Sequence, residues 1–341
     1  MTNKITIAID AMGGENSPNK VIEGLSYFLK KNKKNSDYRF FMYGNEALII
    51  EKLKTFNIDK NENIKIFNTL SIVSDEETPL TAIKNSKNSS MWNSINSQIA
   101  DGADISLSAG NTGVLFVISK MLLKTIDQIS KPALAGLWPN SAGVNVVMDL
   151  GANIECDENN LFDFAQMGAA LYKSLFPNEK PKVALLNIGS EEIKGTGLIK
   201  KAYAKLKSTN IEEDFIFNGY IEGNKITNGE SNVIITDGFT GNIALKTAEG
   251  TAKFITDNLK KSLSKLSLLF SFVSLKKFKE KLDPRKYNGA IFLGLRGPVV
   301  KSHGSTDAIG FYYSIDLCYR IIKGDLMSQI KKNLSHIHGK K

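Results

Sequence analysis

Short apolar runs alternate with amphipathic stretches along most of this chain. The runs are rich in Ile, Val and Leu, which is typical of buried strands, and the stretches that follow carry apolar residues at helical spacing. A loop rich in Gly, Asn, Asp and Thr joins each run to its helix. Five such strand–loop–helix units are predicted, over residues 5–31, 103–124, 144–176, 182–206 and 233–250.

The last unit has an unusually polar junction. Val233–Ile235 predicts a buried strand, and the residues from Ile243 onward predict a helix. The small or polar residues between them include Asp237, Gly238, Thr240, Gly241 and Asn242. A plain connection needs only a few residues, so this junction is expected to have a further role.

The alternation predicts one α/β domain over residues 1–341, with a mostly parallel sheet covered by helices on both faces. In such a sheet every strand-to-helix loop lies at the carboxyl edge of the strands. The five polar loops are therefore expected to form one shared site. Each loop also delivers a helix N-terminus, whose N–H groups and positive dipole end suit an anion.

The stretch 258–282 departs from this pattern. Its apolar residues fall on two opposite sides of a helical wheel, which favours an inserted amphipathic helical hairpin over one continuous helix. Lysines flank its apolar tip, which suits the surface of an anionic bilayer, and burial against a second subunit is the competing interpretation. The residues expected to contact the membrane are Leu266, Leu268, Leu269, Phe270 and Phe272.

Composition places the chain among ordinary globular proteins. It has 341 residues, of which 42% are apolar and 23% charged. No targeting signal precedes the first predicted strand, and the apolar stretches fall short of the roughly 20 residues of a membrane span. A cytoplasmic protein is therefore expected. The net charge of +9 favours acidic partners.

Several classes of site lack the residues they need. Cys156 and Cys318 lie far apart, and only His303 of three histidines has a promising setting, so no metal site is expected. The chain has neither GxxxxGK[ST] nor GxSxG, and "GTGLIK" at 195–200 misses GxGxxG at its last position. A Walker-type nucleotide site, a dinucleotide fingerprint and a covalent acyl-enzyme are thus unsupported. We therefore expect the chemistry to depend on positioning an anionic ligand and on electrostatic stabilisation of its charge.

Seven loop motifs follow one another along the chain. They are "IAIDAMGGENSP", "LSAGNTG", "MDLGANIEC", "LLNIGSEEIKG", "NGYIEGNKI", "TDGFTGNIALKTAEG" and "LDPRKYNGAIFLGLRGPVVKSHGSTDAIG". In this order they resemble the motifs of the phosphate acyltransferases of bacterial phospholipid synthesis, the PlsX type. The resemblance implies transfer of a fatty acyl group from acyl carrier protein to inorganic phosphate. The acyl-phosphate product would serve a membrane glycerol-3-phosphate acyltransferase.

The same resemblance implies further properties. The fold is expected to be similar to that of the isocitrate and isopropylmalate dehydrogenase group and of phosphate acetyltransferases. Homodimers associated peripherally with the inner face of the cell membrane are expected. No metal or nucleotide cofactor and no nucleic-acid partner are expected.

The implied reaction needs no protein nucleophile, because phosphate is itself a competent one. Lys194 is the candidate for offsetting negative charge on the tetrahedral centre, against the alternative of a solvated loop lysine. Asp237 would accept a proton from phosphate or orient Asn242 and Lys194. Asn242 would donate to the oxyanion or act as a helix N-cap. His303 would protonate the leaving thiolate, or is a structural histidine near Asp307.

Further loop residues are expected to bind the substrates. They are Asp10, Gly13, Gly14, Asn111, Thr112, Gly113, Asn153, Asn187, Gly195, Thr240 and Gly241. Glu15, Ser17, Lys84 and Thr306 depart from the usual family pattern. Position 84 usually holds Arg, and Lys cannot make the bidentate contact of Arg, so the resemblance carries no anion clamp to this position.

Other functions remain open. The same site residues would suit a phosphate acyltransferase that takes its acyl group from acyl-CoA. Activity measured with each acyl donor distinguishes this enzyme from one that uses acyl carrier protein. A non-catalytic, membrane-docked protein that binds acyl carrier protein would show no phosphate-dependent turnover. A dinucleotide-linked dehydrogenase would rest on fold analogy alone, without a fingerprint.

Overall fold

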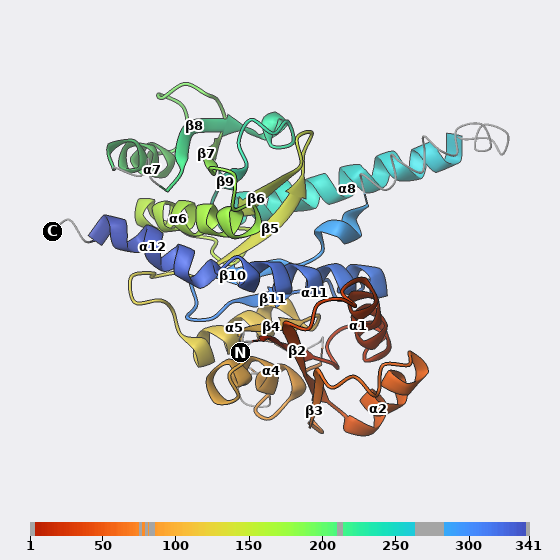
Figure 1. Ribbon diagram of the computed structural model, residues 1–341. Coiled ribbons are helices and arrows are strands. Elements are labelled where there is room, and N and C mark those ends of the chain that lie inside the picture. Colours follow the sequence, from red (N-terminus) through yellow and green to blue (C-terminus); the bar gives the residue numbers. More distant parts are fainter. Residues whose placement is uncertain are drawn as a thin grey trace.

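The computed structural model describes residues 4–74, 77–78, 81, 86–209, 214–262 and 283–338. Eleven strands in these ranges form one sheet (Figure 1). The strands are β1 (Ile5–Asp10), β2 (Tyr38–Gly44), β3 (Ile64–Asn68), β4 (Ile105–Ser108), β5 (Ala133–Pro139), β6 (Val144–Met148), β7 (Lys182–Asn187), β8 (Ile216–Glu222), β9 (Val233–Ile235), β10 (Ala290–Leu293) and β11 (Val299–Lys301).

Helices follow most of the strands. The α-helices are α1 (Asn19–Lys31), α2 (Glu46–Thr55), α4 (Ser90–Ala100), α5 (Thr112–Leu123), α6 (Glu158–Leu175), α7 (Gly197–Ser208), α8 (Gly238–Ser262), α11 (Ala308–Lys323) and α12 (Leu326–His338). Two short 3-10 helices are η1 (Gly223–Lys225) and η2 (Pro284–Tyr287). All five predicted strand–loop–helix units are therefore present, as β1–α1, β4–α5, β6–α6, β7–α7 and β9–α8.

The sheet contains two parallel blocks that run in opposite directions. The strand order is β3-β2-β1-β4-β11-β10-β5-β6-β9-β7-β8. The first five strands are mutually parallel, and so are the last four. Between them, β10 pairs antiparallel with both β11 and β5, and β5 pairs antiparallel with β6. Three successive reversals turn the second block over, so the carboxyl ends of the two blocks face opposite edges.

Both faces of the sheet are covered, because alternate residues of the strands pack into different cores. On β1, Ile7 and Ile9 belong to a large core shared with α1, α6, α11 and α12. Ala8, between them, belongs to a separate small cluster with Phe41 and Tyr43. α4 and α5 pack against each other over a further cluster. The predicted mostly parallel α/β sheet is thus confirmed.

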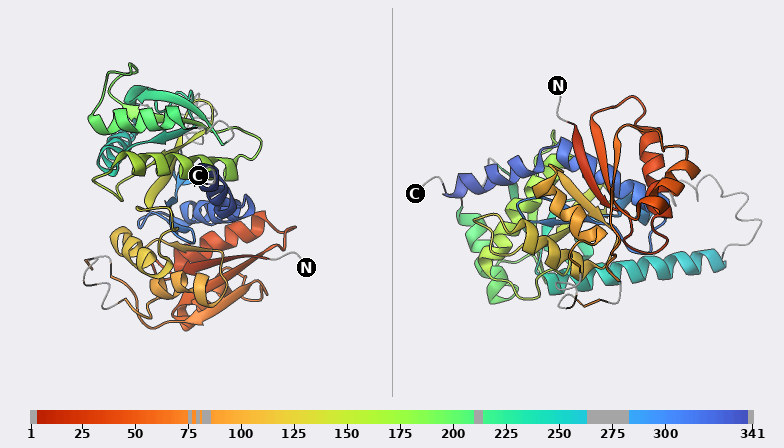
Figure 2. Two further views of the ribbon diagram at one scale, coloured as in Figure 1. Left: turned by 90° about the vertical axis from the view of Figure 1, so that its left-hand side faces the viewer. Right: turned by 90° about the horizontal axis from the view of Figure 1, so that it is seen from below.

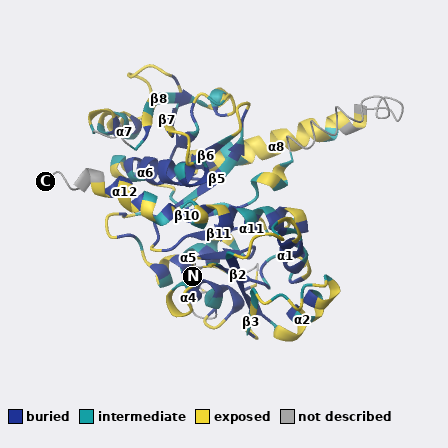
Figure 3. Ribbon diagram, in the orientation of Figure 1, coloured by how far each residue is buried: buried dark blue, intermediate teal, exposed yellow. Residues whose placement is uncertain are grey.

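The two blocks form two halves of the molecule (Figure 2). α11 packs against α1 of the first half and against α6 and α12 of the second, so it joins them. α8 starts in the second half and projects well beyond the body of the protein (Figure 1). Most of its length is exposed (Figure 3).

The predicted hairpin at 258–282 overlaps the structure only at its start. Residues 258–262 form the end of α8. Residues 263–282, which include all five predicted membrane-contact positions, lie outside the described residues, as does Lys84. Within the described ranges, none of the helices combines the length and apolar character needed to cross a bilayer.

Candidate active site

Three loops meet where β1, β4 and β11 end, and we call them the first loop cluster (residues 11–18, 109–111 and 302–307). Asp10, at the end of β1, accepts a hydrogen bond from the Ser108 hydroxyl at 2.7 Å. Its side chain is only 1% exposed, and this burial raises its pKa. The predicted binding residue Asp10 therefore ties the first loop to the end of β4.

The two glycines of the first loop are required by close packing. A Cβ on Gly13 would lie 2.5 Å from Asp10 Oδ2 and 2.8 Å from the Gly110 nitrogen. Gly14 has φ +78°, and a Cβ there would lie 2.8 Å from the Ala109 carbonyl oxygen. Both glycines thus let the loops after β1 and β4 approach each other.

Two lysines cross-link this cluster from inside. Lys20 and Lys301 are 4% and 9% exposed. The Lys20 ammonium donates to the Gly304 carbonyl. The Lys301 ammonium donates to the Ser302 carbonyl, and to the Ala109 carbonyl at 3.4 Å. Buried ammonium groups therefore hold the loops after β4 and β11, and Lys20 reaches the latter from the start of α1.

His303 is an exposed residue at the rim of the first loop cluster. The backbone N–H of Ser305 donates to its Nδ1 at 3.3 Å, so the neutral ring carries its proton on Nε2. Asp307, its expected partner, instead accepts from the Gly310 N–H at 2.9 Å and from Arg285. The imidazole of His303 thus has a defined tautomer, with Nε2 as the proton donor.

The surroundings of His303 favour the neutral ring. Partial desolvation lowers its pKa, and the ammonium groups of Lys301, Lys246 and Lys20 lower it further. The carboxylate of Glu249 opposes them. Because Lys246 and Glu249 lie on α8, that helix runs close enough to the first loop cluster to act on His303.

Asn288 holds the His303 loop in place with one side chain. Its amide nitrogen donates to Ser302 Oγ at 2.9 Å, to the Gly310 carbonyl at 2.9 Å and to Ser314 Oγ at 3.0 Å. Its amide oxygen accepts from the backbone N–H of His303 at 3.0 Å. The loop after β11 is therefore fixed to the first turn of α11.

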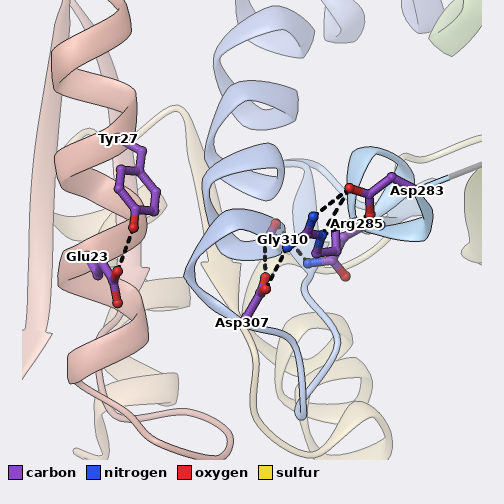
Figure 4. A network of polar contacts seen from close by, with 7 residues as sticks. Glu23, Tyr27, Asp283, Arg285, Asp307 and Gly310 are labelled. Atoms are coloured by element: carbon purple, nitrogen blue, oxygen red, sulfur yellow. Dashed lines mark hydrogen bonds and ion pairs between the residues drawn. The ribbon is translucent and has the colours of Figure 1, made fainter. Parts of the chain in front are cut away.

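A charged network supports the same loop from outside (Figure 4). Arg285 bridges Asp283 at 2.7 Å and Asp307 at 2.9 Å, and Asp307 caps α11. The Arg285 guanidinium also holds the pKa of Asp283 below its ordinary value. On α1 nearby, the Tyr27 hydroxyl donates to Glu23 at 2.5 Å. The chain that returns after residue 282 is thereby anchored next to the His303 loop.

The predicted donor loop after β4 forms the start of α5. Asn111 Oδ1 accepts from the N–H groups of Gly113 at 3.0 Å and Val114 at 3.1 Å, so Asn111 is the N-cap. Its amide nitrogen donates to the Glu77 carbonyl at 3.3 Å. Thr112 is exposed and Gly113 is half-buried. The helix N-terminus is as predicted, and the Asn111 oxygen is used to cap it.

A second loop cluster comprises residues 149–153 after β6 and 236–242 at the start of α8. Asp149 is fully buried and accepts three backbone N–H bonds, together with one from the Asn153 amide at 2.8 Å. The Asn153 amide also donates to the Pro132 carbonyl at 2.8 Å. Burial raises the pKa of Asp149. The predicted amide of Asn153 therefore organises this loop.

Asp237 is the N-cap of α8. Its carboxylate accepts from the Thr240 N–H at 2.8 Å and from the Thr240 hydroxyl at 2.9 Å. The helix starts at Gly238, five residues before the predicted start at Ile243. The suggestion that Asn242 is the N-cap is therefore wrong. Asn242 lies one turn inside the helix and is exposed.

The glycines of this junction serve helix packing, which explains why they misled the sequence-based boundary. A Cβ on Gly241 would lie 1.9 Å from the Asp149 carbonyl oxygen. A Cβ on Gly238 would lie 2.5 Å from the Asn153 carbonyl oxygen. Gly at both positions lets the first turn of α8 rest directly on the 149–153 loop.

Lys194 lies in the loop between β7 and α7. Because β7 pairs parallel with β9, this loop lies at the same sheet edge as the start of α8. Its side chain is exposed, and Glu191 and Glu192 are its neighbours in the sequence. The Asn187 amide donates to the Lys194 carbonyl at 3.2 Å. Gly195 has φ +93°, and a Cβ there would lie 2.4 Å from Asn187 Oδ1. Asn187 and Gly195 thus shape the loop that presents Lys194.

The prediction of one shared carboxyl edge is wrong. β10 and β5 reverse the sheet, so the loops after β6, β7 and β9 do not share an edge with those after β1 and β4. α8 nevertheless connects the two clusters. Asn242 and Lys246 are four residues apart, which is about 6 Å along a helix, and Lys246 acts on His303.

Three residues of these clusters were not selected from the sequence. Lys20 and Lys301 read there as two among 44 basic residues. Asn288 lies next to a glycine and reads as a turn residue. Each lies inside or next to one of the seven motifs, and this position was the feature of the sequence that could have indicated a role. Their burial and their contacts arise only from tertiary packing.

The remaining candidate chemistry in the described ranges is limited. No group of three or more His, Cys, Asp or Glu side chains there is arranged to hold a metal ion. Cys318 is buried and Cys156 half-buried. Burial raises the pKa of Cys156 to about 11, which disfavours a reactive thiolate.

Comparison with known proteins identifies close relatives. Residues 5–329 match the model of a family described as fatty acid synthesis protein. The chain is 52% identical to a phosphate acyltransferase of Pelagibacter ubique, over 98% of this chain and 100% of that protein. It is 40% identical to a phosphate acyltransferase of Sinorhizobium fredii, over 98% and 97% of the two chains.

Solved structures with a similar fold are distant in sequence. One is the EutD phosphotransacetylase from Staphylococcus aureus, with a TM-score of 0.62, 15% identity and 94% of each chain covered. Another is a putative 4-hydroxythreonine-4-phosphate dehydrogenase from Salmonella typhimurium, with a TM-score of 0.54 and 10% identity, covering 94% of this chain and 100% of that one. These likenesses support the fold class.

Proposed function

This chain belongs to the PlsX-type family of phosphate acyltransferases, and on that premise we propose that it transfers a fatty acyl group from acyl carrier protein to inorganic phosphate. The observation that carries the proposal is the 52% identity to a phosphate acyltransferase over 98% of this chain and 100% of that protein. The product would be an acyl-phosphate for glycerol-3-phosphate acylation.

The chemistry is a direct substitution at a thioester. A phosphate oxygen forms a bond to the acyl carbon, and the C–S bond of the tetrahedral intermediate then breaks. The sulfur leaves with the electron pair as a thiolate, which takes up a proton. The protein has to hold an anion next to the thioester and stabilise the oxyanion that forms.

The second loop cluster and the neighbouring loop after β7 supply candidates for these tasks. Asn242 presents an exposed amide on the first turns of α8, where the helix dipole also favours negative charge. Lys194 supplies an exposed ammonium that would offset charge on the tetrahedral centre. Asp237 would orient this helix start through its bonds to Thr240.

His303 is the candidate acid for the departing thiolate. Only the imidazolium form could give up a proton to the thiolate, and lysines on three elements lower the pKa of His303 and so disfavour that form. The neutral ring would still donate a hydrogen bond from Nε2 to the leaving sulfur. Because a thiolate is already a good leaving group near neutral pH, its contribution is expected to be smaller than that of Lys194.

The proposal extends to partners. Acyl carrier protein is acidic, which suits the net charge of +9. A homodimer would cover the exposed apolar residues of α8, such as Phe254 and Ile255. Peripheral attachment to the inner face of the membrane, through residues 258–282, is part of the same proposal.

The test measures thiol release from purified acyl carrier protein that has been loaded with a long-chain acyl group, with and without inorganic phosphate. Wild type and Lys194→Ala are compared, with Lys201→Ala as a control that removes an exposed lysine of α7. We expect phosphate-dependent release that falls about a hundredfold or more in Lys194→Ala, the scale of one lost oxyanion contact, and little change in Lys201→Ala.

Other outcomes would assign a different function. A rate of thiol release that is the same with and without phosphate would indicate a thioesterase and refute the mechanism. Turnover of acyl-CoA alone would keep the phosphate acceptor and change the donor. Binding of acyl carrier protein without any turnover would favour the non-catalytic alternative.

A further inference from the structure

Five large apolar side chains are exposed at the edge of the sheet that carries Lys194 and Asn242. They are between 50% and 81% exposed, and we call them the apolar edge patch (Ile154, Ile188, Ile193, Phe239 and Ile243). All five follow the carboxyl ends of the neighbouring strands β6, β9 and β7. Single exposed apolar residues are normal on a protein surface, whereas a group of them at one place marks a binding surface.

A backbone contact joins the part of the patch after β6 to the part on α8. The Gly238 N–H donates to the Asn153 carbonyl at 2.8 Å. Ile154 and Phe239 directly follow these two residues in the sequence. Ile243 lies one turn after Phe239 on the same face of α8. The loop after β6 and the first turns of α8 therefore present their apolar side chains together.

The loop after β7 adds the remaining two residues. β7 pairs parallel with β9 as far as Leu185, and Ile188 lies three residues further, at the level where α8 begins. Ile193 directly precedes Lys194. A Cβ on Gly189 would lie 3.1 Å from Lys194 Cγ, so the aliphatic stem of Lys194 lies against the residue that follows Ile188. The patch thus continues from α8 into the loop that carries Lys194.

The candidate catalytic groups lie within this patch. Lys194 is the neighbour of Ile193, and Asn242 lies between Phe239 and Ile243 on the first turns of α8. A thioester carbonyl held by the Lys194 ammonium and the Asn242 amide would have its acyl carbon beside exposed apolar side chains. The aliphatic chain of the substrate starts at that carbon.

We propose that the apolar edge patch binds the aliphatic chain of a long-chain acyl thioester, next to the reacting carbonyl. The inference rests on the proposed function, whose substrate joins a polar thioester to a long apolar chain. Each methylene group placed on the patch leaves water, so affinity should rise with chain length until the chain passes the end of the patch.

A second copy of this protein is a poorer occupant of the patch. A subunit packed there would cover Lys194 and Asn242, which the proposed reaction needs to be accessible. The exposed residues Phe254 and Ile255 lie at least about 16 Å further along α8 than Ile243, so a dimer contact at that end of the helix does not require the patch.

Binding of two unreactive probes to the wild-type full chain tests the proposal. The probes are S-dodecyl pantetheine and S-butyl pantetheine, thioethers that lack the carbonyl and cannot transfer an acyl group. Titration calorimetry below the micelle concentration gives both dissociation constants. We expect the dodecyl probe to bind at least about a hundredfold more tightly than the butyl probe. Equal affinities for the two probes would overturn the proposal.

Polar substitutions then assign the chain-binding residues. One variant carries Ile188→Asn with Ile193→Asn in the loop after β7, and the other carries Phe239→Gln with Ile243→Gln on α8. All four positions are exposed, so both variants are expected to fold. The ratio of the two dissociation constants should fall about tenfold or more in each variant, because the longer chain loses its apolar contacts.

A matched control removes exposed apolar side chains elsewhere. Ile99→Asn with Met121→Gln changes α4 and α5, where these residues are 61% and 40% exposed, and should leave the ratio within about twofold. An unchanged ratio in both patch variants would overturn the assignment. Sedimentation of the same proteins tests the competing occupant, since loss of a wild-type dimer with unchanged probe binding would make the patch a subunit interface instead.

These measurements distinguish failure of this inference from failure of the proposed function. Because the probes do not react, absence of phosphate-dependent thiol release would leave a chain-length-dependent affinity intact and would refute only the proposed function. Phosphate-dependent release combined with equal affinities for the two probes would keep the proposed function and refute only the chain-binding role of the patch.

Discussion

Asp163 on α6 illustrates how burial dominates the pKa of a single side chain. Desolvation raises its pKa to about 7, with Lys205 opposing the shift. Because the folded state binds this proton more tightly than the unfolded chain, stability falls as the pH rises from about 4 to about 7. Above pH 7 the ionised carboxylate costs stability in full.

Asp163→Asn should therefore stabilise the protein at about pH 8 more than at about pH 5. The difference in unfolding free energy is expected to be on the order of 1 kcal/mol, because partial exposure screens the shift. Urea unfolding at both pH values measures it. Asp59→Asn, at an exposed position, is the control. An equal gain at both pH values would contradict the assignment.

Asn288 is the corresponding case for a neutral side chain. Its amide satisfies the Ser302 and Ser314 hydroxyls, which are fully buried, and the backbone N–H of His303. Asn288→Ala would leave these groups without that partner, so the unfolding free energy should fall by about 3 kcal/mol.

Urea unfolding of Asn288→Ala and of Asn35→Ala gives the comparison. Asn35 is exposed, so its removal should change stability by less than about 0.5 kcal/mol. If the two substitutions change the unfolding free energy by the same amount, the hydrogen bonds of the Asn288 side chain do not stabilise the His303 loop.

Helix α8 shows how a helix start depends on its neighbours. Its first turn rests on the 149–153 loop because Gly241 has no Cβ. Gly241→Ala should displace that turn, lower the unfolding free energy by about 2 kcal/mol or more and impair phosphate-dependent release. Gly250→Ala on the same helix meets open space and should raise stability by up to about 1 kcal/mol.

Thermal unfolding and thiol release measured on this glycine pair check both effects. Opposite signs for the two substitutions are expected. A Gly241→Ala variant as stable and active as wild type would mean that the contact with the Asp149 carbonyl is easily relieved.

The same helix shows where sequence-based inference stops. Apolar periodicity located all five strand–loop–helix units, because a buried strand and an amphipathic helix each impose a local spacing. It placed the start of α8 at Ile243, because Gly238 and Gly241 are poor helix formers. Their use follows from a contact with residues distant in sequence, and no local pattern records that contact. The burial of Lys20 and Lys301 is likewise a product of packing.

The sheet as a whole extends this lesson. The sequence predicted a mostly parallel sheet, and two parallel blocks are present. It did not predict their opposite directions, because β10 enters between β11 and β5 from late in the chain. Such long-range pairing has no local signature. The polar loops consequently form two clusters on opposite edges, and α8 brings one within electrostatic reach of the other.

The exposure of α8 leads to a prediction about assembly. Phe254 and Ile255 are 70% and 56% exposed, although side chains of this kind are each stabilised by about 1.5–3 kcal/mol on full burial. If two copies of α8 cover each other's apolar residues, Phe254→Asp with Ile255→Asp should weaken the dimer at least about a hundredfold. Thr256→Asp with Asn258→Asp adds the same charge at exposed polar positions and should leave the dimer intact. Analytical sedimentation of the three proteins measures their dimer dissociation constants. A monomeric wild type would contradict the dimer and favour membrane contact by these apolar residues instead.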